Sequence, residues 1–218
     1  MTTKHTVQAG ESMSTIAQKF GFSDWNTLWK DAENASLKKK RNNPNVLYPG
    51  DVVTIPEVEI KQESAATDQK HEFTCKLPKM KDVLRLQLDD ENGEPMAEQD
   101  CIVTLDNETE LNLTTDGEGI VEIEIPINVR SAKIEIDGCE WPLEIGQLNP
   151  VDEPTEDNNI SGAQSRLNNL GFDCPTSDEL DDRTQQAIKA FQSTQKNLDI
   201  TGQLDKKTCS ALKKEHGC

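Results

Sequence analysis

The residue types that most often do enzyme chemistry are few and scattered in this chain. His5, His71 and His216 are its three histidines, and none stands at metal-site spacing from an acidic residue. No HExxH, GxSxG or cysteine–histidine pattern occurs. Glu122 and Glu124 share one face of a predicted strand, and paired carboxylates could act as acid and base. Nothing around them predicts the burial that raises a carboxyl pKa, so the sequence favours a protein that is not an enzyme.

Cysteine is the other residue type here that could bind a metal or form a covalent bond. The six cysteines show no CxxC pair, so neither a zinc site nor a thioredoxin-type site is expected. Two alternatives stay open. The cysteines are buried thiols that a reducing cytosol keeps free, or they form disulfides after delivery to an oxidising space, with Cys174 joined to Cys209 or Cys218 and a pair among the middle three. We expect no metal and no cofactor.

The composition predicts several small modules instead of one large core. Hydrophobic residues make up 33% of the chain and aromatic residues 4%, which is little apolar material for a single core of 218 residues. The net charge is −17, and nearly all of the excess acid lies in residues 58–154. An acidic body repels nucleic-acid phosphates and anionic lipid, so we expect neither as a partner. No apolar stretch reaches membrane-spanning length.

The beginning of the chain predicts a strand, two helices and a second strand. Apolar residues recur at three- and four-residue spacing over 12–20, with a serine as N-cap and Gly21 after the last turn. A second helix follows, in which Trp25 and Trp29 share one face and are expected to pack in the core. Residues 52–56 form a β-rich run that ends at a proline.

The segments His5–Ala17 and Leu47–Pro56 resemble the LysM family. The resemblance implies a βααβ domain over residues 1–57 that binds peptidoglycan and other N-acetylglucosamine glycans in a shallow groove between two loops. Backbone amides would bond the acetamido groups, and Leu47 or Tyr48 would pack on a sugar face. Carried over by position, the site residues are Gly10, Glu11, Ser12, Met13, Asn45, Val46, Leu47, Tyr48 and Pro49.

One segment is longer than the LysM family usually has. Residues 31–43 contain Lys38-Lys39-Lys40-Arg41, and we expect an extra helical turn followed by a basic loop. Four adjacent cations are typical of a solvated face. The alternative is contact with wall phosphates, wall carboxylates or an acidic protein.

Residues 73–148 are expected to form an antiparallel β-sandwich that acts as a spacer between polar linkers at 58–72 and 149–158. Short alternating runs separated by turns indicate the strands, and the turn sequences resemble those of prealbumin-like spacer domains. Trp141 is expected to close the sheet edge or the core. The glutamates expected to face solvent are Glu118, Glu122, Glu124 and Glu135. The aspartates for which solvation is favoured over calcium binding, because EF-hand spacing is missing, are Asp89, Asp90 and Asp116.

Residues 159–218 predict three short helices around an apolar core. The segments Gln164–Phe172, Thr184–Ala187 and Phe191-Gln192 resemble the three-helix peptidoglycan-binding family, and Phe191 is expected to anchor the core. The ligand residues that we carry over to the surface of this bundle are Arg166, Asn169 and Arg183.

Together these features predict an α+β multidomain protein that binds peptidoglycan at both ends. The arrangement resembles accessory proteins of type VI secretion or phage-tail-like injection systems, which implies a spike or effector protein as a partner. The alternative is a structural adaptor or clamp that binds a spike, baseplate or effector protein and no glycan. The first residues lead into the first module without an apolar signal core. We therefore expect a chain that is cytoplasmic when synthesised, with delivery to the periplasm or exterior by an injection system.

Overall fold

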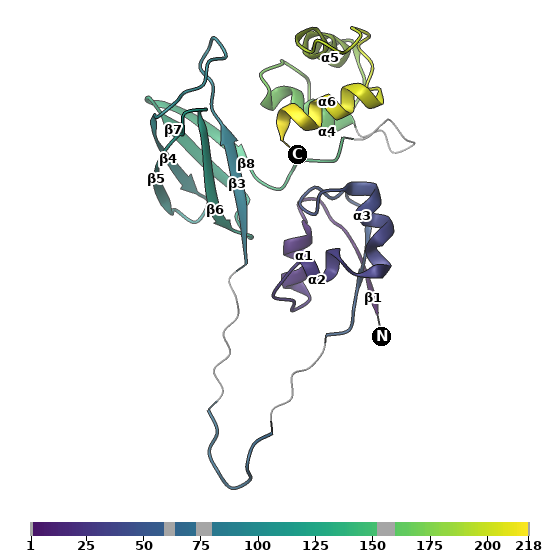
Figure 1. Ribbon diagram of the computed structural model, residues 1–218, viewed down its shortest axis with the longest axis vertical. Coiled ribbons are helices and arrows are strands. Elements are labelled where there is room, and N and C mark those ends of the chain that lie inside the picture. Colours follow the sequence, from purple (N-terminus) through teal and green to yellow (C-terminus); the bar gives the residue numbers. More distant parts are fainter. Residues whose placement is uncertain (1, 59–63, 73–79, 152–159, 218) are drawn as a thin grey trace.

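The computed structural model describes residues 2–58, 64–72, 80–151 and 160–217 of the chain (Figure 1). These residues form a mixed helix-and-strand module at the N-terminal end, a sheet-rich module in the middle and a helical module at the C-terminal end. Residues 64–72 are exposed and lie apart from all three modules in Figure 1. No helix in the described ranges is long and apolar enough to cross a membrane.

In the N-terminal module two strands pair and the helices lie between them in the sequence. The strands are antiparallel, with Thr6 opposite Val52 and Thr3 opposite Ile55. The predicted order of strand, helices and strand is confirmed. The elements are β1 (Thr3–Thr6), α1 (Met13–Lys19), α2 (Asn26–Trp29), the 3-10 helix η1 (Ala32–Asn34), α3 (Ala35–Arg41) and β2 (Val52–Ile55).

The apolar residues that recur at helical spacing in the sequence form the core of this module. Helix α1 buries Met13 and Ile16 completely, and Trp29 is buried beside them while Trp25 packs partly on the same cluster. Both tryptophans therefore serve the core, as predicted. Gly21 follows α1 with φ +82°, a left-handed conformation that glycine adopts at low cost after a helix.

The segment after α2 differs from the prediction. Residues 31–43 form η1 and then α3, so the basic run lies in a helix and not in a loop. The three lysines are exposed, but Arg41 is buried. The predicted solvated face of four cations is therefore wrong at Arg41. Cations suit the last turn of a helix because its free carbonyl groups carry partial negative charge.

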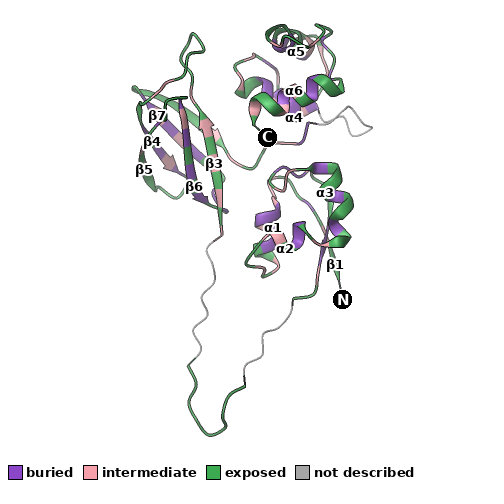
Figure 2. Cartoon of the chain, in the orientation of Figure 1, coloured by how far each residue is buried: buried purple, intermediate pink, exposed green. Residues whose placement is uncertain are grey.

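The middle module contains two antiparallel sheets. One pairs β3 with β6, and the other has the order β5-β4-β7-β8. Their inward side chains, among them Val103, Ile123 and Ile134, form one core, and Figure 2 shows buried and exposed positions alternating along the strands. The strands are β3 (Lys81–Gln87), β4 (Asp100–Leu105), β5 (Glu110–Thr114), β6 (Ile120–Pro126), β7 (Ser131–Ile136) and β8 (Cys139–Glu144).

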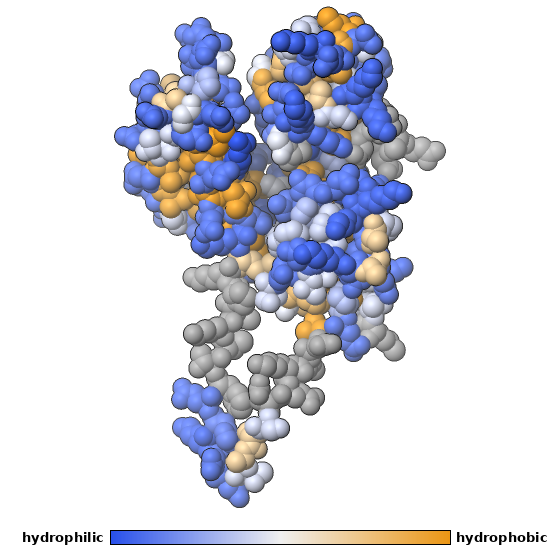
Figure 3. Space-filling view, viewed as in Figure 1, coloured by the Kyte–Doolittle hydropathy of each residue, from blue (hydrophilic) through white to orange (hydrophobic). Residues whose placement is uncertain are grey.

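Strand β8 was not among the predicted strands. Trp141 lies on it opposite Ile134 and remains 42% exposed. Because β8 is an edge of the four-stranded sheet, Trp141 has a neighbouring strand on one side only. Figure 3 shows apolar surface gathered on this module. Three of the four glutamates expected at the surface are exposed, whereas Glu135 is half-buried. The expected start of this module at Phe73 lies outside the described residues.

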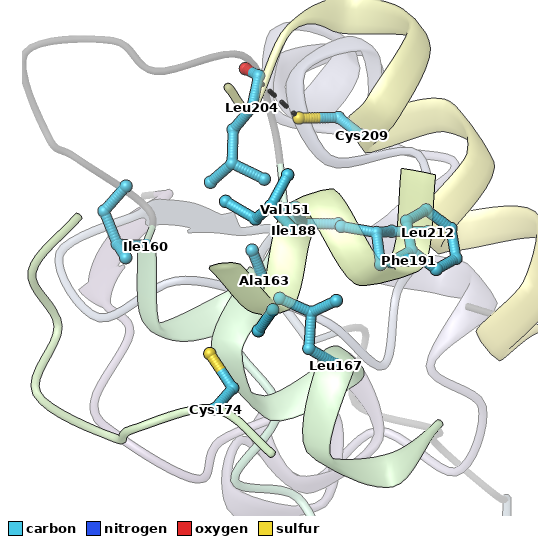
Figure 4. Close-up of a cluster of buried hydrophobic side chains, with 11 residues drawn as sticks. Val151, Ile160, Ala163, Leu167, Cys174, Ile188, Phe191, Leu204, Cys209 and Leu212 are labelled. Atoms are coloured by element: carbon cyan, nitrogen blue, oxygen red, sulfur yellow. Dashed lines mark hydrogen bonds between the residues drawn. The ribbon is translucent and has the colours of Figure 1, made fainter. Parts of the chain in front are cut away.

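The C-terminal module consists of α4 (Ile160–Asn169), α5 (Asp182–Thr194) and α6 (Lys206–His216). Asp181 and Asp205 cap α5 and α6 through the N–H groups of Thr184 and Thr208. The helices enclose a core around Phe191 (Figure 4), as predicted. The helix caps and the apolar spacing thus position the three helices.

Residues 149–151, here called the strap, pack against the helical module and do not form the expected linker. Val151 is fully buried in the helical core. Arg166 Nη1 donates to the Asn149 carbonyl at 2.7 Å. An ideal Cβ on Gly162 would lie 2.1 Å from the Pro150 carbonyl oxygen, so only glycine allows the strap to lie this close to α4. The remainder of the expected linker, from residue 152, lies outside the described residues.

Candidate functional site

The two loops carried over as the glycan groove lie side by side at the start of α1. Met13 N–H donates to the Pro44 carbonyl at 2.9 Å, which joins loop 9–13 to the segment that leads into loop 45–49. Pro44 was not among the predicted site residues. The sequence carried no signal for it, because a backbone carbonyl is available at every position.

Glu11 holds the first loop together. Its carboxylate lies 2.6 Å from His5 Nε2, accepts from the Gln8 N–H at 3.0 Å and accepts from Lys19 Nζ at 3.0 Å. Burial alone would raise the pKa of Glu11, but the hydrogen bonds from His5, Gln8 and Lys19 outweigh it and hold the pKa below its ordinary value. Glu11 therefore ties β1, the loop and α1 together as an anion.

The next two residues of the first loop also serve the fold. Ser12 forms a capping box with Thr15, in which each side chain accepts from the backbone N–H of the other residue. The Met13 side chain is fully buried. The polar groups of Glu11 and Ser12 thus form hydrogen bonds within the domain, and the Met13 side chain lies in its core.

The second loop is held by a buried ion pair. Arg41 Nε lies 2.6 Å from Asp51 Oδ2 and its Nη2 lies 2.9 Å from Oδ1. Asp51 also accepts from the Tyr48 N–H at 3.0 Å, and the Arg41 guanidinium lies 5.5 Å from the centre of the Tyr48 ring. Burial would raise the pKa of Asp51, but the bonds from Arg41 and Tyr48 hold it below its ordinary value.

Fewer residues of the second loop are exposed than were predicted to contact a glycan. Val46 and Leu47 are buried, with Leu47 in the module core, so the Leu47 side chain is not a floor for a sugar ring. Tyr48 is half-buried, and Asn45 and Pro49 are exposed. Tyr48, with the Arg41 cation against its ring, is the flat surface that this loop presents.

Most backbone amides of the predicted groove are already used. The N–H groups of Glu11, Ser12 and Met13 donate within the module. Those of Asn45, Val46 and Tyr48 do so as well. Among the nine predicted residues, the amides left for a ligand within the described structure are those of Gly10 and Leu47, since proline has none. The groove therefore has few backbone donors for the acetamido groups that the resemblance implies.

In the helical module the three carried-over ligand residues have different environments. Arg166 is 1% exposed and donates to the carbonyls of Asn149 and Gly162, so it is a structural residue and the expectation of a surface ligand is wrong. Asn169 Nδ2 lies 2.9 Å from His216 Nε2 at the surface. Arg183 is exposed and pairs with Asp173 at 3.2 Å. Asn169 contacts His216 and the Arg166 charge acts on the same imidazole, but Arg166 is buried and so offers no surface contact to a ligand.

Two buried glutamines hold the loops of this module. Gln164 Nε2 donates to Thr184 Oγ1 at 2.9 Å, and Gln192 Nε2 donates to Thr208 Oγ1 at 2.9 Å. Gln164 Oε1 accepts from the Asp178 N–H, and Gln192 Oε1 accepts from the N–H groups of residues 201 and 202. Two Leu-Asp-x-x-Thr runs, at 180–184 and 204–208, are the sequence signal that could have revealed this repeated arrangement.

The paired carboxylates Glu122 and Glu124 do not form an acid–base pair suited to hydrolysis. Both are exposed, and they pair across the strands with Arg85 and Lys81 at 3.3 and 2.6 Å. The hydrogen bond from Lys81 lowers the pKa of Glu124, whereas a general acid needs a raised one. In the described part of the chain, no three His, Cys, Asp or Glu side chains gather as a metal site would require.

The aspartates considered for calcium shape turns instead. Asp90 accepts from the N–H groups of Asn92 and Glu94, and Asp116 from those of Glu118 and Ile120. These backbone bonds lower the pKa of both aspartates. Each carboxylate thus replaces a backbone acceptor in a tight turn.

No two of the four cysteines in the described part of the chain form a disulfide with each other. Cys101, Cys174 and Cys209 are buried, and Cys139 is exposed. Burial raises the pKa of Cys101 and Cys174. The alternative of a Cys174–Cys209 disulfide is therefore not the state of this structure, while Cys75 and Cys218 lie outside the described residues.

Two family models match the chain. The LysM domain model matches residues 5–56, and the peptidoglycan binding domain model matches residues 156–212. The chain therefore contains a LysM domain at its N-terminal end and a peptidoglycan-binding domain at its C-terminal end. Neither the curated proteins nor the solved structures include a significant match to the chain. Both matched families are binding modules, and together they support peptidoglycan binding.

Proposed function

We propose that the protein is a non-enzymatic peptidoglycan-binding protein that holds the cell wall at both ends, with the sheet-rich module as a spacer. The observation that carries this proposal is the presence of two different peptidoglycan-directed domains in one chain. Two sites on one chain bind a polymer at high effective concentration, which raises avidity roughly 10²- to 10⁴-fold over either site alone. Shallow individual sites are therefore sufficient.

The geometry of the LysM domain supports a sugar contact at Tyr48. The buried Arg41–Asp51 pair fixes both the backbone and the ring of this residue. Exposed Asn45 and Pro49 flank it. A rigid aromatic ring next to polar groups suits an amphipathic sugar, which has an apolar face and a polar rim.

Co-sedimentation with purified sacculi tests the proposal. The full-length protein is expected in the pellet, and Tyr48→Ala is expected to weaken binding while Tyr48→Phe retains it. Trp141→Ala is the matched control, because Trp141 is an exposed aromatic residue on the middle module. If the full-length protein stays in the supernatant, and N-acetylglucosamine oligomers shift no backbone amide resonance, peptidoglycan binding is refuted.

For the cellular setting we propose an accessory or cargo protein of a contractile injection or type VI secretion system, delivered from the cytoplasm to the periplasm or exterior. The support is the arrangement of a LysM domain, a sheet-rich module and a helical binding domain in a short acidic chain. Affinity purification from cells that carry such a system should recover a spike or effector protein. Recovery of that partner without any sacculus binding would favour the adaptor function instead.

A further inference from the structure

The LysM domain contacts the sheet-rich module on the side where α1 begins. Ser14 on α1 is fully buried, and its Oγ donates to Asp82 Oδ1 on β3 at 2.9 Å. Met80, just before β3, packs against the hydrophobic core of the LysM domain. The N-terminal end of α1, which follows the first groove loop directly, is therefore held by the neighbouring module.

A second contact reaches the groove loop itself. An ideal Cβ on Gly10 would lie 3.6 Å from Gln147 Nε2 and 3.9 Å from the Gly146 carbonyl oxygen. Gln147 belongs to the segment after β8, which is anchored by the Ile145 N–H bond to the Arg130 carbonyl at 2.8 Å. The Gln147 amide thus lies against Gly10, at the mouth of the first loop.

The amide of Gln147 is available for a ligand. Its side chain is exposed and has no hydrogen-bond partner among the described residues. A primary amide both donates and accepts, which matches the C=O and N–H of an acetamido group. The loop that it borders has lost the amides of Glu11, Ser12 and Met13 to bonds within the LysM domain. Gln147 is therefore placed where the groove is short of donors.

We propose that the sheet-rich module completes the glycan groove of the LysM domain, with Gln147 binding an acetamido group beside Gly10. This inference rests on the proposed function, and it changes the role of the middle module from a spacer to a part of the site. Gly10 is suited to such a composite site, because a side chain there would fill the space between the loop and Gln147. Its φ of +79° also favours glycine.

The length of the connection shows that contacts, and not the covalent link, set this arrangement. The 25 residues 56–80 join β2 to β3, and a chain of that length can span at most roughly 80–90 Å when fully extended. Such a linker permits many relative positions of the two modules. The Ser14–Asp82 bond and the Met80 contact therefore select the one that places Gln147 at the groove.

Titration of full-length variants with an N-acetylglucosamine tetramer, followed by calorimetry and by backbone amide shifts, tests the inference. Gln147→Ala and Gln147→Glu are both expected to weaken binding about three- to tenfold, the effect of one lost hydrogen bond. Asp82→Ala is expected to weaken it similarly, because the module loses its anchor. The matched controls are Gln87→Ala, an exposed glutamine on β3, and Asp100→Ala, whose carboxylate accepts from Thr114 Oγ1 at 2.9 Å within the sheet.

Each outcome decides the inference. Weaker binding by Gln147 and Asp82 variants, with unchanged controls and unchanged unfolding midpoints, supports the composite groove. Wild-type affinity in Gln147→Ala overturns it and leaves the proposed function intact. Tighter binding in Gln147→Ala or Asp82→Ala also overturns it, because the segment would then cover the groove instead of completing it. If the wild-type protein does not bind the tetramer, the proposed function itself fails.

Discussion

Replacing Asp51 by asparagine should remove most of the stability of the LysM domain. The side chains of Arg41 and Asp51 are only 2% and 4% exposed, so Asp51→Asn removes the carboxylate charge that pairs with a buried guanidinium. Breaking a buried pair in this way costs about 3–5 kcal/mol. A module of about 55 residues has a free energy of unfolding of only roughly 3–8 kcal/mol.

Urea unfolding followed by tryptophan fluorescence measures this loss. Trp25 and Trp29 lie in the LysM domain and Trp141 is the third tryptophan of the chain, so a Trp141→Phe background reports on the LysM domain alone. With a urea m-value of about 1 kcal/mol/M for a module of this size, the midpoint of Asp51→Asn should fall by about 3 M or the domain should be unfolded in water.

Lys40→Met is the control for this experiment. Its ammonium lies 3.6 Å from Asp51 but is 54% exposed, so its loss should cost less than about 1 kcal/mol. The double variant Arg41→Met/Asp51→Leu should recover part of the stability, because no charge is left buried. If Asp51→Asn lowers the midpoint no more than Lys40→Met does, the buried pair does not hold the second loop and this reasoning is wrong.

The same pair predicts a response to acid. The pKa of Asp51 in the folded state is lowered, so its contribution to stability is fully present above its unfolded pKa of about 4 and is lost as the pH falls through the folded value. Asp51→Asn should remove this part of the acid sensitivity of the LysM domain.

Three further outcomes are expected. Gly162→Ala should destabilise the helical module in circular-dichroism melts, although alanine favours helices by about 1 kcal/mol, because its Cβ would meet the strap; a higher melting temperature would contradict this. The half-buried position of His216 and the nearby Arg166 charge lower its pKa to about 4, so its contribution to stability should be complete above pH ~6.5 and decline toward pH 4, and melts of His216→Gln should lack that decline. In a Cys75→Ser/Cys218→Ser background, a thiol reagent should label Cys139 first while the buried thiols react only on unfolding; equal rates for all four would contradict their burial.

The elements of the fold could be predicted because their signals are local. Ser12, Asp181 and Asp205 cap helices within three residues of their own positions. Strands β3 to β7 alternate with period two, and apolar side chains recur at helical spacing in α1 and α5. Strand β8 was missed because an edge strand with a proline and an exposed tryptophan lacks that alternation.

The environment of the charged residues could not be predicted, because it depends on partners that are distant in the sequence. Arg41 follows a run of exposed lysines, yet it is buried because it forms an ion pair with Asp51. Arg166 resembles any helical surface arginine until the strap brings the Asn149 carbonyl to it from 17 positions away. A cation is buried only where acceptors compensate its desolvation, and no local pattern reports where those acceptors lie.

The same limit applies to the hydrogen bonds of the loops that the sequence assigns to the glycan groove. Resemblance to a family predicts the course of the backbone in a binding loop. It does not show which N–H groups of the loop donate hydrogen bonds to other parts of the same chain. Here Asn43, Pro44 and Asp51 accept from the amides of the second loop and of Met13, so those groups stabilise the fold and are lost to a ligand. Because an unpaired buried amide is costly, a compact loop satisfies its own donors first. The glycan contacts that we propose therefore lie at the loop margins: the Tyr48 ring, the Gly10 amide and the Gln147 side chain that the neighbouring module places beside Gly10.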